Sequence, residues 1–337
     1  MFLILINLGF SLLPVLLFLV FLYLLDRFRL VEVRSLVICL VWGIISVAAA
    51  YLFNNLLGKW IGIPFDSQSR YMAPVVEESL KAIIIIYLLK KKRAGFLVDA
   101  AIYGFATGAG FALMENILYL VSATEEASPA TWIVRGLGTA VMHGGCTGLM
   151  ALVAVAAITR GHETPPAIAS GLTLAIILHS GFNHFALPPL FQTLLVMILF
   201  PSLFIGIFAL SNRQLTRWLE IEFSSEVEIL SMIRKGTLGE TRPGRYLLSV
   251  SNRFLPETVV DLYCYLSLYL ELSIKAKRNL MLQEQGMKPP QEPDLEEKLT
   301  ELNHLRKMIG PVGEATMAPL IRMSYRDLWK LNQISPK

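Results

Sequence analysis

Residues 71–93, "YMAPVVEESLKAIIIIYLLKKKR", decide how the rest of the chain is interpreted. The segment is apolar enough for a membrane-spanning helix, yet it contains Glu77, Glu78 and Lys81. An isolated charge at the centre of such a helix costs about 2.5 to 3.5 kcal/mol, and these residues normally face a bundle interior or a water-filled cavity. The three charges therefore predict a polar site enclosed by other helices.

The composition indicates a polytopic membrane protein. Of 337 residues, 54% are hydrophobic and only 17% are charged, which a soluble domain of this size would not show. The net charge of +4 is small and the basic residues lie between apolar blocks, so we expect no nucleic-acid partner. Cys39, Cys146 and Cys264 are far apart in apolar surroundings, and we expect all three to be core residues.

Hydropathy predicts an all-α fold, a transmembrane helical bundle of about seven spans. Each span needs roughly 20 apolar residues. The first is expected to be retained, since it lacks the basic start of a signal peptide. The predicted spans are 2–25, 36–53, 73–89, 97–121, 132–158, 167–187 and 189–210.

The loop charges predict the orientation. Basic residues gather in every second loop, whereas the other loops hold few, and one of them is the acidic "ATEEASP" at 123–129. Because basic loops stay in the cytoplasm, we expect the N-terminus outside and the C-terminus inside. The basic loops contain Arg27, Arg29 and Arg34, then Lys90, Lys91, Lys92 and Arg93, then Arg160, then Arg213 and Arg217.

Three regions are expected along the chain. Residues 1–70 form two transmembrane helices and an outer loop, 71–210 form a transmembrane core, and 211–337 form a mostly helical cytoplasmic tail. The apolar run at 259–278 is an alternative eighth span, but the acids within it favour a packed or interfacial helix.

The spans of the core carry further polar side chains. At about 1.5 Å of rise per residue, Glu77, Glu78, Glu115, His143 and His179 all lie roughly 6 to 17 Å below the outer ends of their spans. A shared depth predicts one site in the outer half of the membrane. The polar set also includes Asn116, Asn183 and His184, of which Asn116 and His184 are alternatively hydrogen-bonding links between helices.

Helical spacing suggests how these groups pair. Glu77 and Lys81 are four residues apart, the spacing of an ion pair on one helix face, which would leave Glu78 available. His179 and Asn183 share a face in the same way. Small residues at every fourth position predict close helix packing. They are Gly104, Gly108 and Ala112 beside Glu115, and Gly136, Ala140, Gly144 and Gly148 beside His143.

These residue types suit hydrolysis. A carboxylate can deprotonate water, imidazoles can bind a metal or stabilise an oxyanion, and an amide can complete the oxyanion hole. Two histidines and a glutamate also match zinc peptidases, although H-E-x-x-H is absent, so the metal stays open. The alternatives are a transporter or proton relay, and a membrane scaffold whose polar residues only link helices. Transporters usually contain internal repeats, and none is visible in this sequence.

Four motifs resemble one known family. "EESLK" at 77–81 resembles the EExxK motif of the PrsW intramembrane proteases, "FALMEN" at 111–116 their FxxxEN, and "HSGFN" at 179–183 their HxxxN. His143 resembles the lone histidine on the preceding span. The resemblance covers about 70–210, and the CAAX-prenyl endopeptidases and ABI proteins are more distant. The CAAX enzymes carry His at the position of Glu115 and Arg at the position of Lys81, so the chain departs from their pattern there.

We therefore predict an intramembrane protease with the following roles. Glu77 or Glu78 is the general base and Lys81 holds the other; spacing favours Glu78 as base, and analogy with the CAAX enzymes favours Glu77. Glu115, His143 and His179 form the metal-binding or electrophilic group, for which Zn²⁺ is the candidate metal. Asn183 is the oxyanion donor.

The resemblance also implies the partners and the location. A PrsW-type protein would perform site-1 cleavage of a membrane-anchored protein, an anti-sigma factor, near the extracytoplasmic face. We expect a multi-pass protein of the bacterial plasma membrane, in contact with the lipid bilayer and with this substrate.

Overall fold

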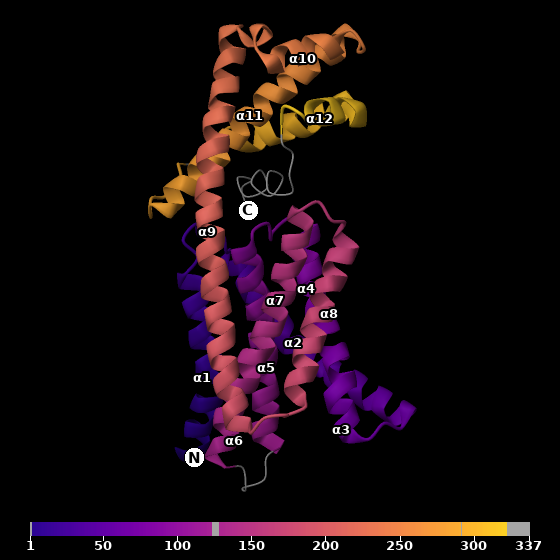
Figure 1. Cartoon of the computed structure of the whole chain (residues 1–337), viewed down its shortest axis with the longest axis vertical. Helices are drawn as coiled ribbons and strands as arrows, with labels where there is room; N and C mark the ends of the chain where they lie inside the picture. The colour runs from indigo at the N-terminus through magenta and orange to yellow at the C-terminus, as the bar shows by residue number, and fades with distance from the viewer. Residues whose placement is uncertain (1, 123–127, 291, 322–337) are drawn as a thin grey trace. The chain divides into compact units, whose positions relative to one another are not determined.

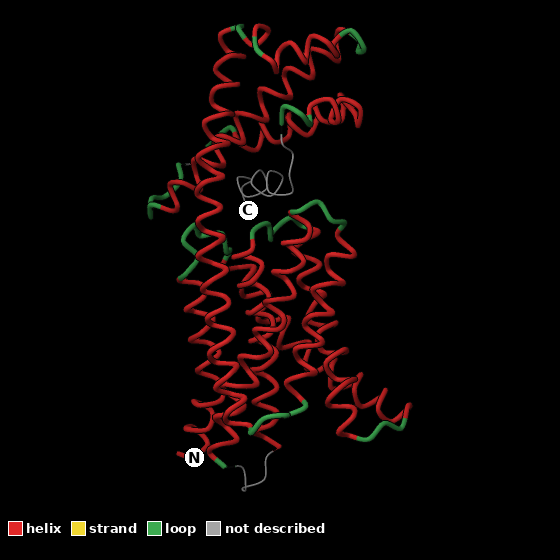
Figure 2. The backbone as a smooth tube through the Cα atoms, in the orientation of Figure 1, coloured by secondary structure: helices red, strands yellow, loops and turns green. Residues whose placement is uncertain are grey.

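The computed structural model describes residues 2–122, 128–290 and 292–321. These residues form helices joined by short connections, and no strand occurs among them (Figure 2). The acidic loop residues 123–127 lie outside the described part. The chain divides into two compact units, Met1–Ser211 and Asn212–Lys337.

The first unit is a helical bundle with α5 at its centre (Figure 1). The central helix packs against α1, α2 and α7, and its side chains are buried over nearly its whole length, because it has partners on all sides. The principal helices are α1 (Phe2–Leu24), α2 (Val33–Ile61), α4 (Ala73–Lys90), α5 (Leu97–Ser122), α7 (Ala140–Thr159), α8 (Thr164–Asn183) and the first part of α9 (Pro189–Lys235).

Two helices of the bundle begin with a π-helical turn. The short α3 (Phe65–Ser67) and the π-turn η1 (Gln68–Met72) lead into α4. In the same way α6 (Pro129–Ile133) and the π-turn η2 (Val134–Thr139) lead into α7. Such turns are rare in proteins as a whole, and those that occur are often found at functional sites.

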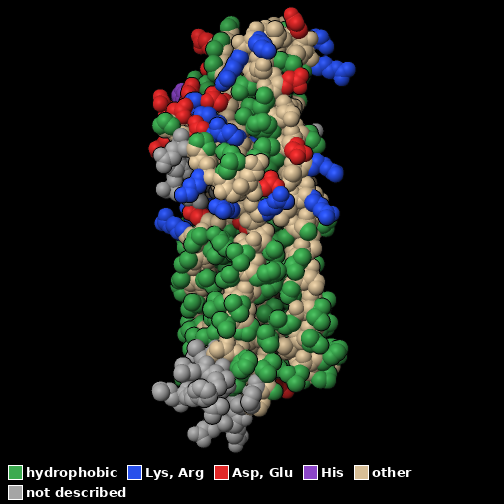
Figure 3. Space-filling view, turned by 90° about the vertical axis from the view of Figure 1, so that its left-hand side faces the viewer, with side chains coloured by type: hydrophobic (Ala, Val, Ile, Leu, Met, Phe, Trp, Pro, Cys, Tyr) green, Lys and Arg blue, Asp and Glu red, His purple; other side chains and the backbone are tan. Residues whose placement is uncertain are grey.

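Within the described part of the chain, five helices are long and apolar enough to cross a membrane: Val33–Ile61, Leu97–Ser122, Ala130–Thr159, Thr164–Asn183 and Pro189–Lys235. The other two predicted spans correspond to α1, whose described apolar part is the shorter Gly9–Leu24, and to α4, which carries the charges. Hydrophobic side chains cover the visible face of this unit in Figure 3. The all-helical fold with membrane helices is confirmed, whereas the count of seven and the orientation stay predictions.

The contact between α5 and α7 depends on glycine. A Cβ added at Gly104 would lie 2.5 Å from the Thr147 carbonyl oxygen, and one at Gly108 would overlap the carbonyl of His143. Only glycine permits this approach, so the predicted close packing is confirmed here. Gly136 instead faces the backbone of α1 at Phe10.

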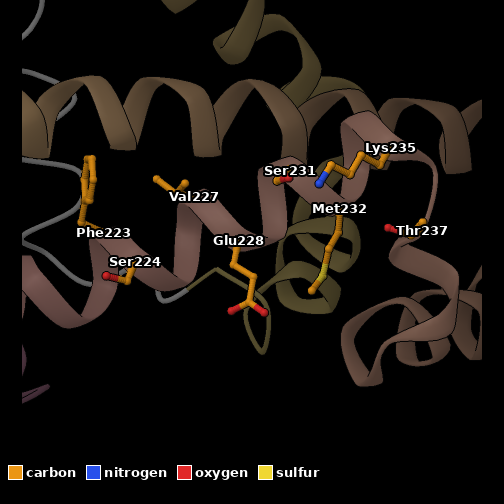
Figure 4. Close-up of a pocket in the computed structure, with 8 residues that line it drawn as sticks. All are labelled: Phe223, Ser224, Val227, Glu228, Ser231, Met232, Lys235 and Thr237. Carbon is orange, nitrogen blue, oxygen red and sulfur yellow. The ribbon is translucent and has the colours of Figure 1, made fainter.

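The second unit is a smaller helical assembly. Leucines together with Tyr265 and Tyr269 form its core. A pocket of about 660 Å³ lies along one flank of α9 (Figure 4). All of its lining residues belong to α9 except Thr237, which follows that helix. The unit contains the end of α9, η3 (Leu238–Glu240), α10 (Arg242–Ser251), α11 (Pro256–Glu284) and α12 (Leu295–Met317).

The run at 259–278 lies inside α11, which is not among the candidate membrane spans. Its leucines pack into the core of the second unit. One expectation about this helix was wrong: Cys264 is exposed, while Cys39 and Cys146 are buried. An amphipathic helix leaves one face to solvent even where its local sequence is apolar.

Candidate active site

The first turns of α4 carry the acid pair. Pro74 is the second residue of α4, which follows the π-turn η1. Consecutive residues point about 100° apart on a helix. Glu78 therefore faces the bundle interior and is fully buried, whereas Glu77 lies at the edge with 13% of its side chain exposed.

Glu78 is held by three side chains. Its Oε1 accepts a hydrogen bond from Lys81 Nζ at 2.5 Å and lies 2.9 Å from His179 Nδ1. Its Oε2 accepts from Thr147 Oγ1 at 3.0 Å. Lys81 thus pairs with Glu78 and not with Glu77, so the prediction that Glu78 is left available was wrong. The rotation of α4 places Glu78 and Lys81 on the same buried face. This burial outweighs the preference for an ion pair between residues four apart, which favoured Glu77.

His143 lies between a cation and a carboxylate. Its Nδ1 is 3.2 Å from Lys81 Nζ and its Nε2 is 3.1 Å from Glu115 Oε2. The tautomer decides which of these two nitrogens carries the proton, and only the unprotonated nitrogen can bind a metal. The ring of Phe111 lies beneath the same ammonium, 4.6 Å from Nζ.

His179 completes the cluster from α8. Its ring meets that of His143 edge-on, with 4.7 Å between the centroids. Since Nδ1 faces Glu78, donation to that carboxylate leaves the Nε2 lone pair free, and Nε2 lies 3.8 Å from Glu77 Oε2. A carboxylate on one ring nitrogen commonly orients the other nitrogen toward a metal.

Glu77, His143 and His179 form a group suited to a metal ion. One ligand atom from each lies within 4.8 Å of the others. The predicted ligand set contained Glu115 in place of Glu77; the structure places Glu115 against His143 but brings Glu77 to both histidines. Two imidazoles and one carboxylate are a donor set of zinc peptidases, so the residues fit the predicted metal.

Two residues of the site were missed. Arg135 of η2 has its Nη2 3.4 Å from Glu115 Oε2, and its Nε donates to Asn116 Oδ1 at 3.1 Å. Its only signal was an arginine in the first turn of the predicted span 132–158, a position at which arginine is either functional or interfacial. Thr147 follows His143 by one helical turn, a spacing that places it on the same face.

The remaining polar residues connect helices. Asn116 Nδ2 donates to the Ser11 carbonyl oxygen at 2.9 Å, and His184 Nδ1 donates to a carbonyl of its own helix at 2.7 Å. Asn183 Nδ2 donates to the Ser69 carbonyl at 3.0 Å, joining the end of α8 to η1. The oxyanion role of Asn183 stays a prediction.

Comparison with known proteins identifies a family for this chain. The family model of the PrsW family intramembrane metalloproteases matches residues 32–207, just over half of the chain and the whole of the cluster. Searches among curated proteins and among solved structures gave no match. The predicted resemblance to this family is confirmed. The chain therefore belongs to the PrsW family of intramembrane metalloproteases, and it is an integral membrane protease that acts on substrates in the lipid bilayer.

Proposed function

We propose that this protease hydrolyses a peptide bond of a membrane-anchored protein with Zn²⁺ held by Glu77, His143 and His179. The observation that carries the proposal is the convergence of carboxylates and imidazoles from α4, α5, α7 and α8 inside an apolar bundle. A purely structural ion pair needs one acid and one base. The additional acids and the two imidazoles suit catalysis.

The buried residues orient the metal-binding group. Glu78 accepts from His179 Nδ1, so the Nε2 lone pair is the one presented to a metal. Lys81 neutralises Glu78 and fixes it on the interior face. When bound, the zinc ion would polarise the peptide carbonyl and lower the pKa of a water toward about 7.

Glu115 is the general base in this proposal. Two carboxylates lie outside the metal-binding group, and Glu78 is fully buried beside Lys81, whereas Glu115 has 34% of its side chain exposed and its Oε2 next to His143 Nε2. Glu115 takes a proton from the water whose hydroxyl adds to the peptide carbonyl carbon. It returns that proton to the leaving nitrogen as the C–N bond breaks. The sequence-based assignment had Glu77 or Glu78 as the base and Glu115 among the metal ligands, whereas this proposal makes Glu115 the base and Glu77 a metal ligand.

The test compares Glu77→Gln with Glu115→Gln in purified protein. We expect Glu77→Gln to lose both zinc and turnover, because a metal ligand is gone. Glu115→Gln should keep about one zinc per chain while turnover falls about 10²- to 10⁴-fold, the usual contribution of a general base. Elemental analysis and cleavage of a transmembrane reporter measure the two quantities. Glu163→Gln, on the exposed connection before α8, is the matched control.

Two outcomes would contradict these assignments. If Glu115→Gln loses the metal while Glu77→Gln keeps it, the two acids have the roles predicted from sequence. If the wild-type protein cleaves the reporter without metal and despite chelators, the zinc assignment fails.

We further infer site-1-type cleavage near the extracytoplasmic face of a bacterial plasma membrane, with an anti-sigma factor as substrate. The alternating basic loops support the required orientation. A reporter fused after Arg93 should be cytoplasmic, and one fused at Ser128 extracytoplasmic. An Arg93 fusion on the outer side would exclude this orientation. Proteins that accumulate uncut in membranes of Glu115→Gln cells would identify the substrate.

A further inference from the structure

The cluster is most exposed at Glu115. Glu115 has 34% of its side chain exposed and Glu77 has 13%, whereas His143 and His179 have 2% each. The side of the cluster at Glu115 therefore offers the widest access to the reacting groups. This side is formed by the C-terminal half of α5 and by η2.

A pocket lies on that side. It has a volume of about 480 Å³, within the range of about 300 to 1,000 Å³ that is usual for ligand sites. Its lining residues come from the end of α5, the segment α6–η2, the connection from α8 to α9 and the start of α9. Figure 1 shows α6 at one end of the bundle. The walls of the pocket are mainly apolar, with Tyr119, Val134, Phe185, Pro188, Pro189 and Leu190 among them.

Arg135 joins this pocket to the cluster. It lines the pocket, stacks over the ring of Tyr119 at 4.1 Å, and reaches Glu115 through Nη2. That Nη2 is buried and makes no well-directed hydrogen bond to any described residue. Arg135 is also the one charged side chain among the described lining residues.

We propose that this pocket receives an apolar side chain of the substrate beside the scissile bond, and that Arg135 Nη2 donates to a backbone carbonyl of the same segment. The inference rests on the proposed function. A transmembrane substrate must be extended for cleavage, and its freed carbonyls cost free energy in an apolar medium unless a donor meets them. A guanidinium next to an apolar cavity meets both requirements.

The experiment varies the pocket and the substrate together. After the wild-type enzyme defines the cleaved bond in a transmembrane reporter, the adjoining residue is changed to Ala, Leu, Phe or Asp. Ala130→Trp places a large ring in the pocket and should lower kcat/KM for the Leu and Phe reporters about tenfold or more, while the Ala reporter changes little. Leu190→Ala enlarges the pocket and should favour the Phe reporter. The Asp reporter should be the poorest for all enzymes.

Matched controls exist on the same helices or on the outer face of the bundle. Leu194→Ala removes an equally exposed leucine one turn further along α9, outside the pocket, and Ala48→Trp adds a ring on the exposed face of α2. Both should keep the wild-type order of reporters. Zinc content should be unchanged in all four variants.

Arg135→Lys tests the second part of the proposal. Lysine keeps the charge near Glu115 but lacks the planar fork, so KM should rise several-fold for every reporter with a smaller change in kcat. An unchanged KM would overturn the role of Arg135. An unchanged order of reporters in both Ala130→Trp and Leu190→Ala would overturn the pocket while the cleavage by wild-type enzyme stands. A wild-type enzyme that holds zinc but cuts no reporter would count against the proposed function.

Discussion

Among the residues that the structure describes, two lysines are completely buried, Lys81 in the first unit and Lys277 in the second, and their surroundings differ. Lys81 pairs with Glu78, which is equally buried, and also contacts His143. Lys277 pairs with Glu226 at 2.7 Å and Glu222 at 3.0 Å on α9. Both ammonium groups lie over an aromatic ring, Phe111 in one unit and Trp218 in the other.

The difference lies in what else touches the acids. Glu78 is shared with His179, and a second imidazole and two further carboxylates lie nearby. The acids around Lys277 are 19% and 15% exposed, and the ion pairs found there among the described residues include no histidine. A buried lysine–glutamate pair is thus weak evidence for a site. Additional imidazoles and carboxylates in contact with the pair provide that evidence.

The largest effect that would test this comparison is expected for Lys81→Met against Lys277→Met. Loss of Lys81 leaves a buried carboxylate without its cation and should cost about 3 to 5 kcal/mol of folding free energy, with loss of turnover. Loss of Lys277 should cost about 1 to 3 kcal/mol, because its glutamates are partly exposed to water, and turnover should remain. Thermal unfolding and reporter cleavage of the full-length protein measure both.

A double variant separates stability from catalysis. Lys81→Met with Glu78→Gln removes both charges, so protein abundance should return. Turnover should stay about 10- to 100-fold below wild type, since a neutral amide orients His179 less firmly. Recovery by Lys81→Met with Glu77→Gln instead would mean that Lys81 pairs with Glu77 after all.

A smaller effect is expected from the packing that brings α5 and α7 together. Gly108→Ala would press on the His143 carbonyl, cost about 1 to 3 kcal/mol, and lower turnover about 10- to 100-fold by displacing His143 from Glu115. Gly181→Ala is the control, since an added Cβ there meets no atom within 4 Å. It should be neutral or slightly stabilising in a helix. Equal activity of the two variants would exclude a role for this close contact.

The smallest effect concerns the surface charges of the second unit. Burial alone would raise the pKa of Glu271, but the hydrogen bonds and charges of Lys298 and Lys275 outweigh it and hold that pKa below its ordinary value of 4.5. A lowered pKa stabilises the fold above the unfolded-state value, and this contribution disappears as the pH falls through the folded-state value. We expect less than about 1 kcal/mol for such a partly exposed pair.

Limited proteolysis of the full-length protein in membranes measures this effect. Cleavage between residues 236 and 321 should be faster at pH 4 than at pH 7. Lys298→Met should raise the rate at pH 7 and reduce the difference between the two pH values. An unchanged pH difference in that variant would show that Lys298 is not responsible.

Much of the site was predictable from local sequence. The residues that carry it are polar groups in apolar spans, and burying each in lipid alone would be so costly that they must face one another. Glu77, Glu78, Lys81, Glu115 and His143 were recognised in this way. Arg135 was missed because it lies near the end of a predicted span, where an arginine is common and reaches the interface.

The sequence by itself determined that the chain forms apolar helices with one polar cluster, because hydropathy, residue type and motif order are local properties. Only the tertiary structure decided that Lys81 pairs with Glu78, that Glu77 joins the two histidines, and that Arg135 connects the cluster to a pocket. These pairings depend on how far each helix is rotated and how closely its neighbours approach, as at Gly108. A rotation of one residue, about 100°, changes which carboxylate faces the interior, and packing between helices sets that rotation.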